Sequence, residues 1–230
     1  MRRILAVVVL LCSMAAAQAE GGLDIYFVRH AETLANASGV NNSGNSNMIS
    51  EQGDEQVSAL TAKLKALHFD AILVSSAPRA IYTILPYLKE TGQKGEIWPE
   101  IAECCWQKER GNITSGQLIT SSTVQLSGEQ EAYLTFRDVN SKHNYGNNSY
   151  ADGVAQVRRA EELLKQQYFG SGKTILIVAH YHSGQVLLAD LLGKTRDEMP
   201  NLENAKLAHL QQGEDGHFTL LSINGKDVTP

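Results

Sequence analysis

The segment Ile25–Val28 constrains the fold most, because it is an apolar, strand-like run that stops abruptly on Arg29 and His30. A buried strand ends where its hydrophobic residues end. In open α/β sheets, ligands bind at the carboxyl ends of the strands. An isolated Arg-His pair is more often only a loop cap. At the end of a rigid strand, however, the same pair can form a phosphate clamp beside a nucleophile.

Two other apolar runs end in a similar way. Ala71–Ser75 is soon followed by Arg79. Thr174–Ala179, an unbroken apolar run suited to the centre of a sheet, ends on His180. Three strand ends that each carry a guanidinium or imidazole group favour one shared anion site over three unrelated loop caps.

Strands that alternate with helices predict an α/β fold, a three-layer, mostly parallel sheet of about six strands with helices on both faces. A chain of 230 residues suits one such domain. We expect a loop over 36–47, an irregular insertion at about 102–150 above the active site, and a kink or break at Pro86. The other predicted strands cover 95–99, 207–211 and 218–223, and the predicted helices cover 51–67, 79–90, 129–139, 152–168 and 183–192.

The residues at these strand ends resemble the motifs of the histidine phosphatase (phosphoglycerate-mutase-like) superfamily, in its mutase-like branch. The resemblance extends from about residue 23 to about residue 223. It implies cleavage of phosphate esters through a phosphohistidine, without a cofactor or a metal. The matching motifs are Arg29-His30-Ala31-Glu32-Thr33 with Asn36, Ser75-Ser76-Ala77-Pro78-Arg79-Ala80, Ile101-Ala102-Glu103 and Val178-Ala179-His180.

The resemblance assigns a role to each of five residues. His30 is the nucleophile, because a neutral imidazole nitrogen can attack phosphorus and divide one difficult step into two. Arg29 and Arg79 offer planar forks that fit phosphate oxygens, and His180 donates to the same oxygens. Glu103 is the general acid that protonates the leaving group. If Glu103 does not fill this role, the alternatives are Glu100 and Glu109.

Three more residues are predicted to contact the substrate or to orient the pocket. Asn36 matches an asparagine that contacts substrate in many relatives, and Glu32 more readily orients the pocket than takes part in the chemistry. Tyr181 stands where the superfamily usually has glycine. Asn204 also resembles a family position, and equally reads as a turn residue. His182 is expected to be structural or to face the insertion.

A metal site made of His30, His180 and His182 is a weak alternative. Carboxylate partners at ligand spacing are missing, and the two arginines would repel a cation. Four other arginines lie outside the matching motifs, and two of them, Arg158 and Arg159, are expected on a solvated helix face. The other two are Arg110 and Arg137.

The N-terminus has the layout of a secretory signal peptide. A basic start at Arg2 and Arg3 precedes an apolar run that ends at Cys12, and Ala17-Gln18-Ala19 is a small-x-small cleavage site. The apolar run is shorter than the roughly 20 residues of a membrane span. Bulky Leu11 argues against lipidation of Cys12. We therefore expect cleavage after Ala19 and a periplasmic or secreted domain over 20–230.

Charge and cysteine content narrow the range of partners. The chain has 20 basic and 25 acidic residues, and loss of the predicted leader leaves 18 against 25. This net negative charge disfavours nucleic acid and anionic membranes as partners. Only Cys104 and Cys105 remain after cleavage. They are adjacent, so they could form a strained vicinal ring, pair with another molecule or stay buried and reduced.

The sequence thus predicts an exported phosphomonoester hydrolase that acts on a small phosphorylated substrate. A phosphoglycerate-type mutase would share the pocket. A pyrophosphatase or an envelope-glycan phosphatase is also compatible. A non-catalytic phosphate-binding module is disfavoured, because a degenerate relative should have lost at least one of the five site residues. Physiological substrate, pH optimum and oligomeric state do not follow from the sequence.

Overall fold

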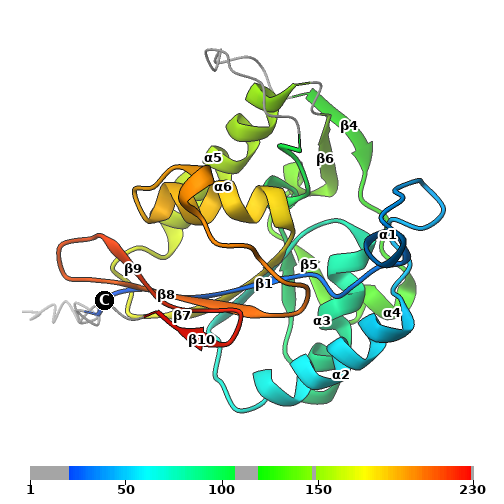
Figure 1. The fold of residues 1–230 in the computed structure, drawn as a ribbon, viewed down its shortest axis with the longest axis horizontal. Helices are drawn as coiled ribbons and strands as arrows, with labels where there is room; N and C mark the ends of the chain where they lie inside the picture. Colours follow the sequence, from blue (N-terminus) through cyan, green and yellow to red (C-terminus); the bar gives the residue numbers. More distant parts are fainter. Residues whose placement is uncertain (1–20, 107–118, 147–148, 229–230) are drawn as a thin grey trace, which may run out of the picture.

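The computed structural model describes residues 21–106, 119–146 and 149–228. Their main element is an eight-stranded sheet (Figure 1). The predicted leader lies outside the described residues. In order across the sheet, the strands are β10 (Lys226–Asp227), β9 (Phe218–Ile223), β8 (Leu207–Gln212), β1 (Asp24–Arg29), β7 (Thr174–Ala179), β2 (Ala71–Val74), β3 (Gly95–Ile97) and β5 (Leu134–Phe136).

Five of these strands are parallel to one another. β1 and β2 both pair with β7, and β3 and β5 continue the parallel half. β8, β9 and β10 extend the sheet beyond β1 in antiparallel pairs. The predicted α/β class is confirmed, but the sheet has more strands than expected. The additional strands β5 and β10 span three and two residues, which is too short to produce a recognisable alternation in the sequence.

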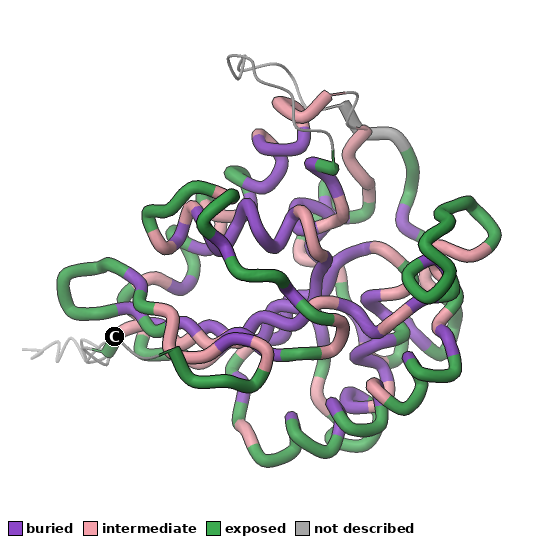
Figure 2. Tube along the Cα trace, viewed as in Figure 1, coloured by how far each residue is buried: buried purple, intermediate pink, exposed green. Residues whose placement is uncertain are grey.

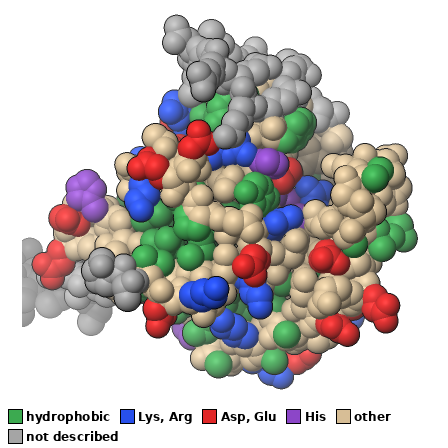
Figure 3. All heavy atoms as spheres, viewed as in Figure 1, with side chains coloured by type: hydrophobic (Ala, Val, Ile, Leu, Met, Phe, Trp, Pro, Cys, Tyr) green, Lys and Arg blue, Asp and Glu red, His purple; other side chains and the backbone are tan. Residues whose placement is uncertain are grey.

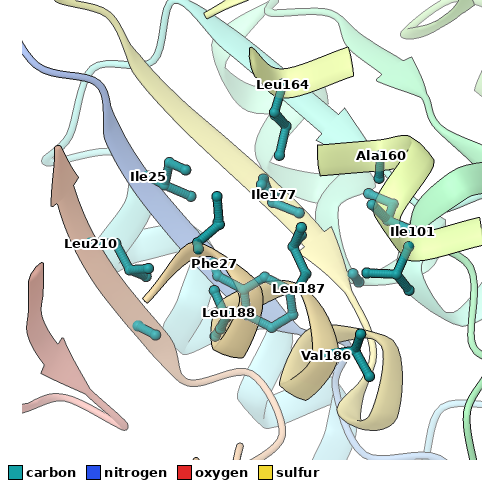
Figure 4. Packing of buried hydrophobic residues seen from close by; sticks show 14 of the residues in the cluster. Ile25, Phe27, Ile101, Ala160, Leu164, Ile177, Val186, Leu187, Leu188 and Leu210 are labelled. Carbon is teal, nitrogen blue, oxygen red and sulfur yellow. The ribbon is translucent and has the colours of Figure 1, made fainter. Parts of the chain in front are cut away.

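Helices cover both faces of the sheet. On β7, Ile175 and Ile177 pack in the cluster that contains residues of α5 (Tyr150–Gln167) and α6 (Tyr181–Leu191). The alternate residues Leu176 and Val178 pack with α2 (Glu51–Leu64) and α3 (Pro78–Thr91). Figure 4 shows the first cluster, and Figure 2 shows that buried residues concentrate in the sheet and on the inner sides of the helices. Two-sided burial accounts for the unbroken apolar run of β7.

Local signals fix where these helices begin. Ser50 caps α2, and Ser149 forms a capping box with Asp152 at the start of α5. Pro78 occupies the first turn of α3, where a missing N–H costs nothing. α3 continues past Pro86 without a break. This proline lacks the N–H that would bond the carbonyl of Tyr82, a residue on the exposed side of the helix.

The region between residues 102 and 150 is more regular than predicted. β4 (Ile119–Thr123) and β6 (His143–Gly146) form an antiparallel ribbon. The predicted helix over 129–139 is wrong, since α4 (Gly128–Glu131) is a single turn started by a capping box and residues 134–136 join the sheet beside β3. Pairing with β3 overrides the local helical tendency. Short 3-10 helices cover Pro99–Ile101, Asn140–Lys142 and Arg196–Glu198.

The described surface carries charges of both signs. Lys and Arg side chains are interspersed with Asp and Glu on the face shown in Figure 3. No helix of the described residues combines the length and the apolar character that crossing a membrane requires. The segment predicted as a loop over 36–47 begins inside a short helix, α1 (Leu34–Ser38), which Thr33 and Asn36 cap.

Candidate active site

Three adjacent parallel strands bring the candidate residues to one edge of the sheet. His30 directly follows β1, His180 follows β7 and Ser75 follows β2. Two hydrogen bonds continue the ladders beyond the strands, from the N–H of His30 to Ala179 and from the N–H of Ser75 to Val178, each 2.9 Å long. A cavity of about 240 Å³ opens there, and its lining includes Arg29, His30, Asn36, Arg79, Glu103 and Tyr181.

His30 lines this cavity as a neutral imidazole. Its side chain is only 4% exposed, and Nδ1 lies 2.7 Å from the carbonyl oxygen of Ala31. A carbonyl only accepts, so Nδ1 carries the proton and Nε2 keeps its lone pair. Burial, together with the positive charge of Arg79, lowers the pKa of His30 to about 3. Nε2 is therefore available as a nucleophile at neutral pH.

His180 is fully buried beside His30, with 5.2 Å between the two ring centroids. Its Nε2 lies 2.7 Å from the hydroxyl of Ser75, which also accepts the N–H of Ala77 at 3.2 Å. We assign the hydroxyl proton of Ser75 to this contact, so that Nδ1 of His180 carries a proton. Within the described residues, Nδ1 has no partner. It is thus a buried donor without an acceptor, beside the ring of His30 that lines the cavity.

Arg29 is held from two sides. Its Nη1 donates to the carbonyl of Leu202 at 2.8 Å, and its guanidinium lies over the ring of Tyr181, 5.1 Å from the centroid. Its buried Nε has no partner among the described residues. Burial lowers the pKa of Arg29, while the charge of Glu103 raises it. One edge of the fork therefore remains open to an anion.

Arg79 comes from the first turn of α3, a position that helical N–H groups and the helix dipole make favourable for anions. Its Nη1 donates to the Asn47 side chain at 3.1 Å. Burial lowers the pKa of Arg79, and nearby Arg29 acts in the same direction. Two partly desolvated guanidinium groups in one cavity repel each other until an anion lies between them.

Glu103 is the carboxyl group of the cavity. Its Oε1 accepts the N–H of Ser183 at 3.1 Å and that of Cys104 at 3.2 Å, while no hydrogen bond to Oε2 is formed within the described residues. Burial raises the pKa of Glu103 despite the opposing effect of these bonds and of the arginines. A carboxyl group that stays protonated to a higher pH suits a general acid.

The predicted substrate-contacting residues fall into two groups. Asn36 and Tyr181 line the cavity, but Asn36 Oδ1 is already shared between Thr33 and Asn204. Glu32 does not line it. Its carboxylate accepts the hydroxyl of Ser50 at 2.8 Å and so ties the His30 loop to the start of α2. Asn204 donates to the carbonyl of His30 at 2.8 Å, which stabilises the same loop.

Of the two alternative general acids, Glu100 and Glu109, only Glu100 lies within the described residues. Glu100 is buried in an ion pair with Arg137, 2.9 Å apart, and also accepts the hydroxyl of Tyr145. Its place is therefore structural. Glu109 and Arg110 lie outside the described residues. Arg158 and Arg159 are exposed on α5, as the helical pattern predicts.

The histidines of the cavity do not fit a metal ion. His182 lines the cavity, but its Nδ1 accepts from the guanidinium of Arg196, and burial lowers its pKa to about 4. Within the described part of the chain, no three His, Cys, Asp or Glu side chains gather in a metal-binding arrangement. Arg29 and Arg79 would also oppose a cation.

Sequence reasoning missed several contributors to the site. Ser75 belongs to one of the matching motifs, but the motif assigns it no role. Its contact with His180 joins residues 105 positions apart, which a local pattern does not indicate. Asn47, which holds Arg79, lies in a segment whose composition indicates only a turn. The cavity also includes residues that no motif marks, namely Asn41, Ser46 and Trp106.

Comparison with known proteins identifies the family of the chain. A family model described as the histidine phosphatase superfamily (branch 1) matches residues 25–225. A search of curated proteins found no match.

Solved structures with a similar fold include several phosphatases. The α-ribazole phosphatase from Shigella flexneri is 17% identical with a TM-score of 0.59, over 90% of this chain and 98% of that one. A phosphoserine phosphatase from Entamoeba histolytica is 17% identical with a TM-score of 0.58, over 88% and 97%. A mycobacterial glucosyl-3-phosphoglycerate phosphatase is 19% identical with a TM-score of 0.58, over 87% and 98%. At these identities the likeness establishes the fold alone.

The buried neutral imidazole of His30 predicts a loss of stability in acid. The unfolded state binds a proton near pH 6.5, whereas the folded state does so only near pH 3. In this window His30 lowers the free energy of unfolding by about 1.4 kcal/mol for each pH unit of acidification. His30→Asn should reduce the slope by that amount in denaturant titrations between pH 6 and pH 4. Comparison of the unmodified protein with His30→Asn at pH 8 gives the loss of packing energy that the substitution causes. An unchanged slope would contradict the lowered pKa of His30.

The contact between Ser75 and His180 predicts a specific effect on anion binding. Ser75→Ala removes the hydroxyl that fixes the tautomer of His180, so orthovanadate should bind about 10-fold more weakly, as expected for loss of one buried hydrogen bond. Ser76→Ala is the matched control, because that hydroxyl bonds Asn144 and not His180. Calorimetric titration measures both affinities. An equal loss of vanadate affinity in the two variants would argue against a role of the Ser75–His180 hydrogen bond in anion binding.

Proposed function

The chain belongs to the histidine phosphatase superfamily, branch 1, and on this premise we propose that it is an exported phosphomonoester hydrolase that works without a metal. One observation carries the proposal: His30 presents a deprotonated Nε2 in a cavity where Arg29, Arg79 and Glu103 converge. Export is proposed from the sequence alone, because of the signal-peptide layout that ends at Ala19.

The first half of the reaction transfers the phosphoryl group to the protein. The two arginines bind the phosphoryl oxygens and neutralise their charge, and His180 donates to one of them from Nδ1. Nε2 of His30 attacks phosphorus while the bond to the leaving oxygen breaks, and Glu103 gives its proton to that oxygen. The products are an alcohol and a phosphohistidine.

The second half returns the phosphoryl group to water. Glu103, now a carboxylate, takes a proton from a water molecule whose oxygen attacks phosphorus, and the bond to His30 breaks. Inorganic phosphate leaves, and both side chains recover their starting protonation. One carboxyl group serves as acid and then as base, so the cycle needs no further residue.

The substrate class is proposed only as small phosphate monoesters. The phosphatases of similar fold are described as acting on α-ribazole phosphate, phosphoserine and glucosyl-3-phosphoglycerate. Their substrates share a phosphate ester and little else. A panel of sugar phosphates, nucleotides, phosphopeptides and lipopolysaccharide fragments is therefore the experiment that narrows the class furthest.

Labelling tests the covalent intermediate. Protein mixed with a [³²P]-labelled phosphate ester and denatured at once should retain a label that is stable in alkali and lost in acid. His30→Ala should retain none, while His182→Ala, altered in the same cavity, should still be labelled. Release of p-nitrophenol from its phosphate should continue in EDTA. A label that persists in His30→Ala would refute the assignment.

The same experiments separate the other candidate functions. Transfer of the phosphoryl group to a phosphoglycerate instead of water would indicate a mutase. Tight phosphate binding without turnover of any ester would indicate a binding module. Loss of turnover in EDTA, restored by a divalent cation, would contradict the metal-independent reaction.

Glu103→Gln should affect substrates according to their leaving groups. An alkyl phosphate such as 2-glycerophosphate needs a proton on its departing oxygen, so kcat/KM should fall about 10²- to 10⁴-fold. For p-nitrophenyl phosphate, whose p-nitrophenolate group leaves without protonation, kcat/KM should fall much less. Because the pKa of Glu103 is raised, the unmodified protein should lose activity toward alkyl phosphates as pH rises through that pKa, and Glu103→Gln should abolish this limb.

Glu100→Gln provides the comparison for this experiment. Glu100 forms a buried ion pair with Arg137, so its substitution should lower stability without discriminating between the two leaving groups. If Glu100→Gln, and not Glu103→Gln, shows the dependence on the leaving group, the roles must be exchanged.

A further inference from the structure

Cys104 and Cys105 form a pair of sulfurs that the proposed reaction does not use. Their two Sγ atoms lie 2.6 Å apart, and both cysteines are free thiols. Cys105 has a φ of +64°, a left-handed conformation that side chains other than glycine, asparagine and aspartate rarely adopt. This backbone conformation accompanies the close approach of the two sulfurs.

The surrounding structure confines the pair. Both residues are buried, with exposures of 0% and 4%. Gly153, in the first turn of α5, forms one wall, because a Cβ added there would lie 2.8 Å from Sγ of Cys105. Its carbonyl oxygen is also 3.4 Å from Sγ of Cys104. A close-packed wall of this kind keeps the sulfurs together and slows the access of an oxidant to them.

Two backbone contacts link the pair to the active site. The N–H of Cys104 donates to Oε1 of Glu103. The carbonyl of Cys105 accepts from Arg196, which also donates to His182 in the cavity. A change in the Cys104–Cys105 backbone must therefore alter the position of the carboxyl group or of the cavity wall.

We propose that Cys104 and Cys105 are a redox modification site that closes reversibly into a vicinal disulfide and thereby displaces Glu103. The oxidant is a small disulfide such as oxidised glutathione. One thiolate attacks it and releases one glutathione, and the neighbouring thiol then attacks the mixed disulfide and releases the second. The two cysteines lose two electrons and two protons, which the two glutathione molecules carry away.

Covalent geometry predicts that this disulfide is easily reduced. Adjacent Cα atoms are about 3.8 Å apart across a trans peptide. Ordinary disulfides span Cα separations of about 4.4–6.8 Å. The ring is consequently strained, and strained disulfides are the labile and regulatory ones. Burial raises the pKa of the Cys104 thiol, so oxidation is slow at neutral pH and needs long equilibration.

The first test measures the disulfide without reference to activity. Protein is equilibrated in glutathione buffers from fully reducing to fully oxidising, quenched in acid, alkylated and mapped by mass spectrometry. We expect a reversible loss of two hydrogen atoms from the peptide that contains Cys104 and Cys105. Cys104→Ala and Cys105→Gly should show no such loss, and glycine at position 105 retains the left-handed backbone.

Four outcomes of this test would overturn the proposal. They are no oxidation in the most oxidising buffer, a stable adduct of glutathione on one cysteine, a disulfide between two molecules, and a disulfide with Cys12, which the mapping also identifies. None of these outcomes depends on the proposed function.

The second test rests on the proposed function and concerns Glu103. Oxidation should lower kcat/KM for 2-glycerophosphate about 10-fold, part of the contribution expected of a general acid, with a much smaller loss for p-nitrophenyl phosphate. Dithiothreitol should restore the activity, and neither Cys104→Ala nor Cys105→Gly should respond to the redox buffer. A vicinal disulfide that leaves both substrates unaffected would overturn the link to Glu103. Absence of turnover in both redox states would refute the proposed function and leave the first test to decide the disulfide.

Discussion

The parallel pairing of β7 with β1 on one side and β2 on the other is the constraint on which the site depends. Because parallel strands point the same way, their carboxyl ends meet at one edge of the sheet. His30, His180 and Ser75 are then neighbours although 150 positions separate the two histidines. β7 is buried on both faces, so a shift in its register would move apolar side chains out of two clusters at once. The packing of the core thereby fixes the geometry of the imidazoles.

Desolvation determines the charge state of the groups at this edge. Burial lowers the pKa of both histidines, so the imidazoles are neutral, and it raises the pKa of Glu103, so this carboxyl group keeps its proton to a higher pH than an exposed one does. Two guanidinium groups then carry the positive charge of the cavity. An acidic protein thus presents a locally cationic site, and a phosphoryl group that enters it finds donors on Arg29 and His180 without other partners among the described residues. The same burial that keeps His30 neutral also lowers the stability of the folded state, because buried donors on Arg29 and His180 have no partner among the described residues.

The sequence predicted the elements whose signals are local and strong. Thr174–Ala179 has the predicted bounds, because an apolar run with polar ends leaves no ambiguity. Residues 134–136 were wrongly predicted as part of a helix, since three residues carry no period and the capping box at Ser127 favours a helix. The motifs brought Arg29, His30, Arg79, Glu103 and His180 into one group, and all but His180 line the cavity while His180 packs against His30. Contacts between distant segments, such as that of Ser75 with His180, have no local signal to read.

The position of Glu103 depends on a different part of the structure from that of the other four residues. It follows a 3-10 turn whose carbonyls, on Glu100 and Ala102, both accept from the side chain of Gln156 in α5. Glu100 in turn pairs with Arg137, while the β4–β6 ribbon contacts this region through the Tyr145 hydroxyl on Glu100. The sheet therefore positions Arg29, His30 and His180, whereas α5, the insertion and the Ser183 N–H at the start of α6 hold Glu103. Because different elements hold these two groups of residues, the insertion can vary around the leaving group without moving Arg29, His30 or His180. On the proposed mechanism, closure of the cysteine pair beside Glu103 would therefore alter proton delivery while phosphate binding persists.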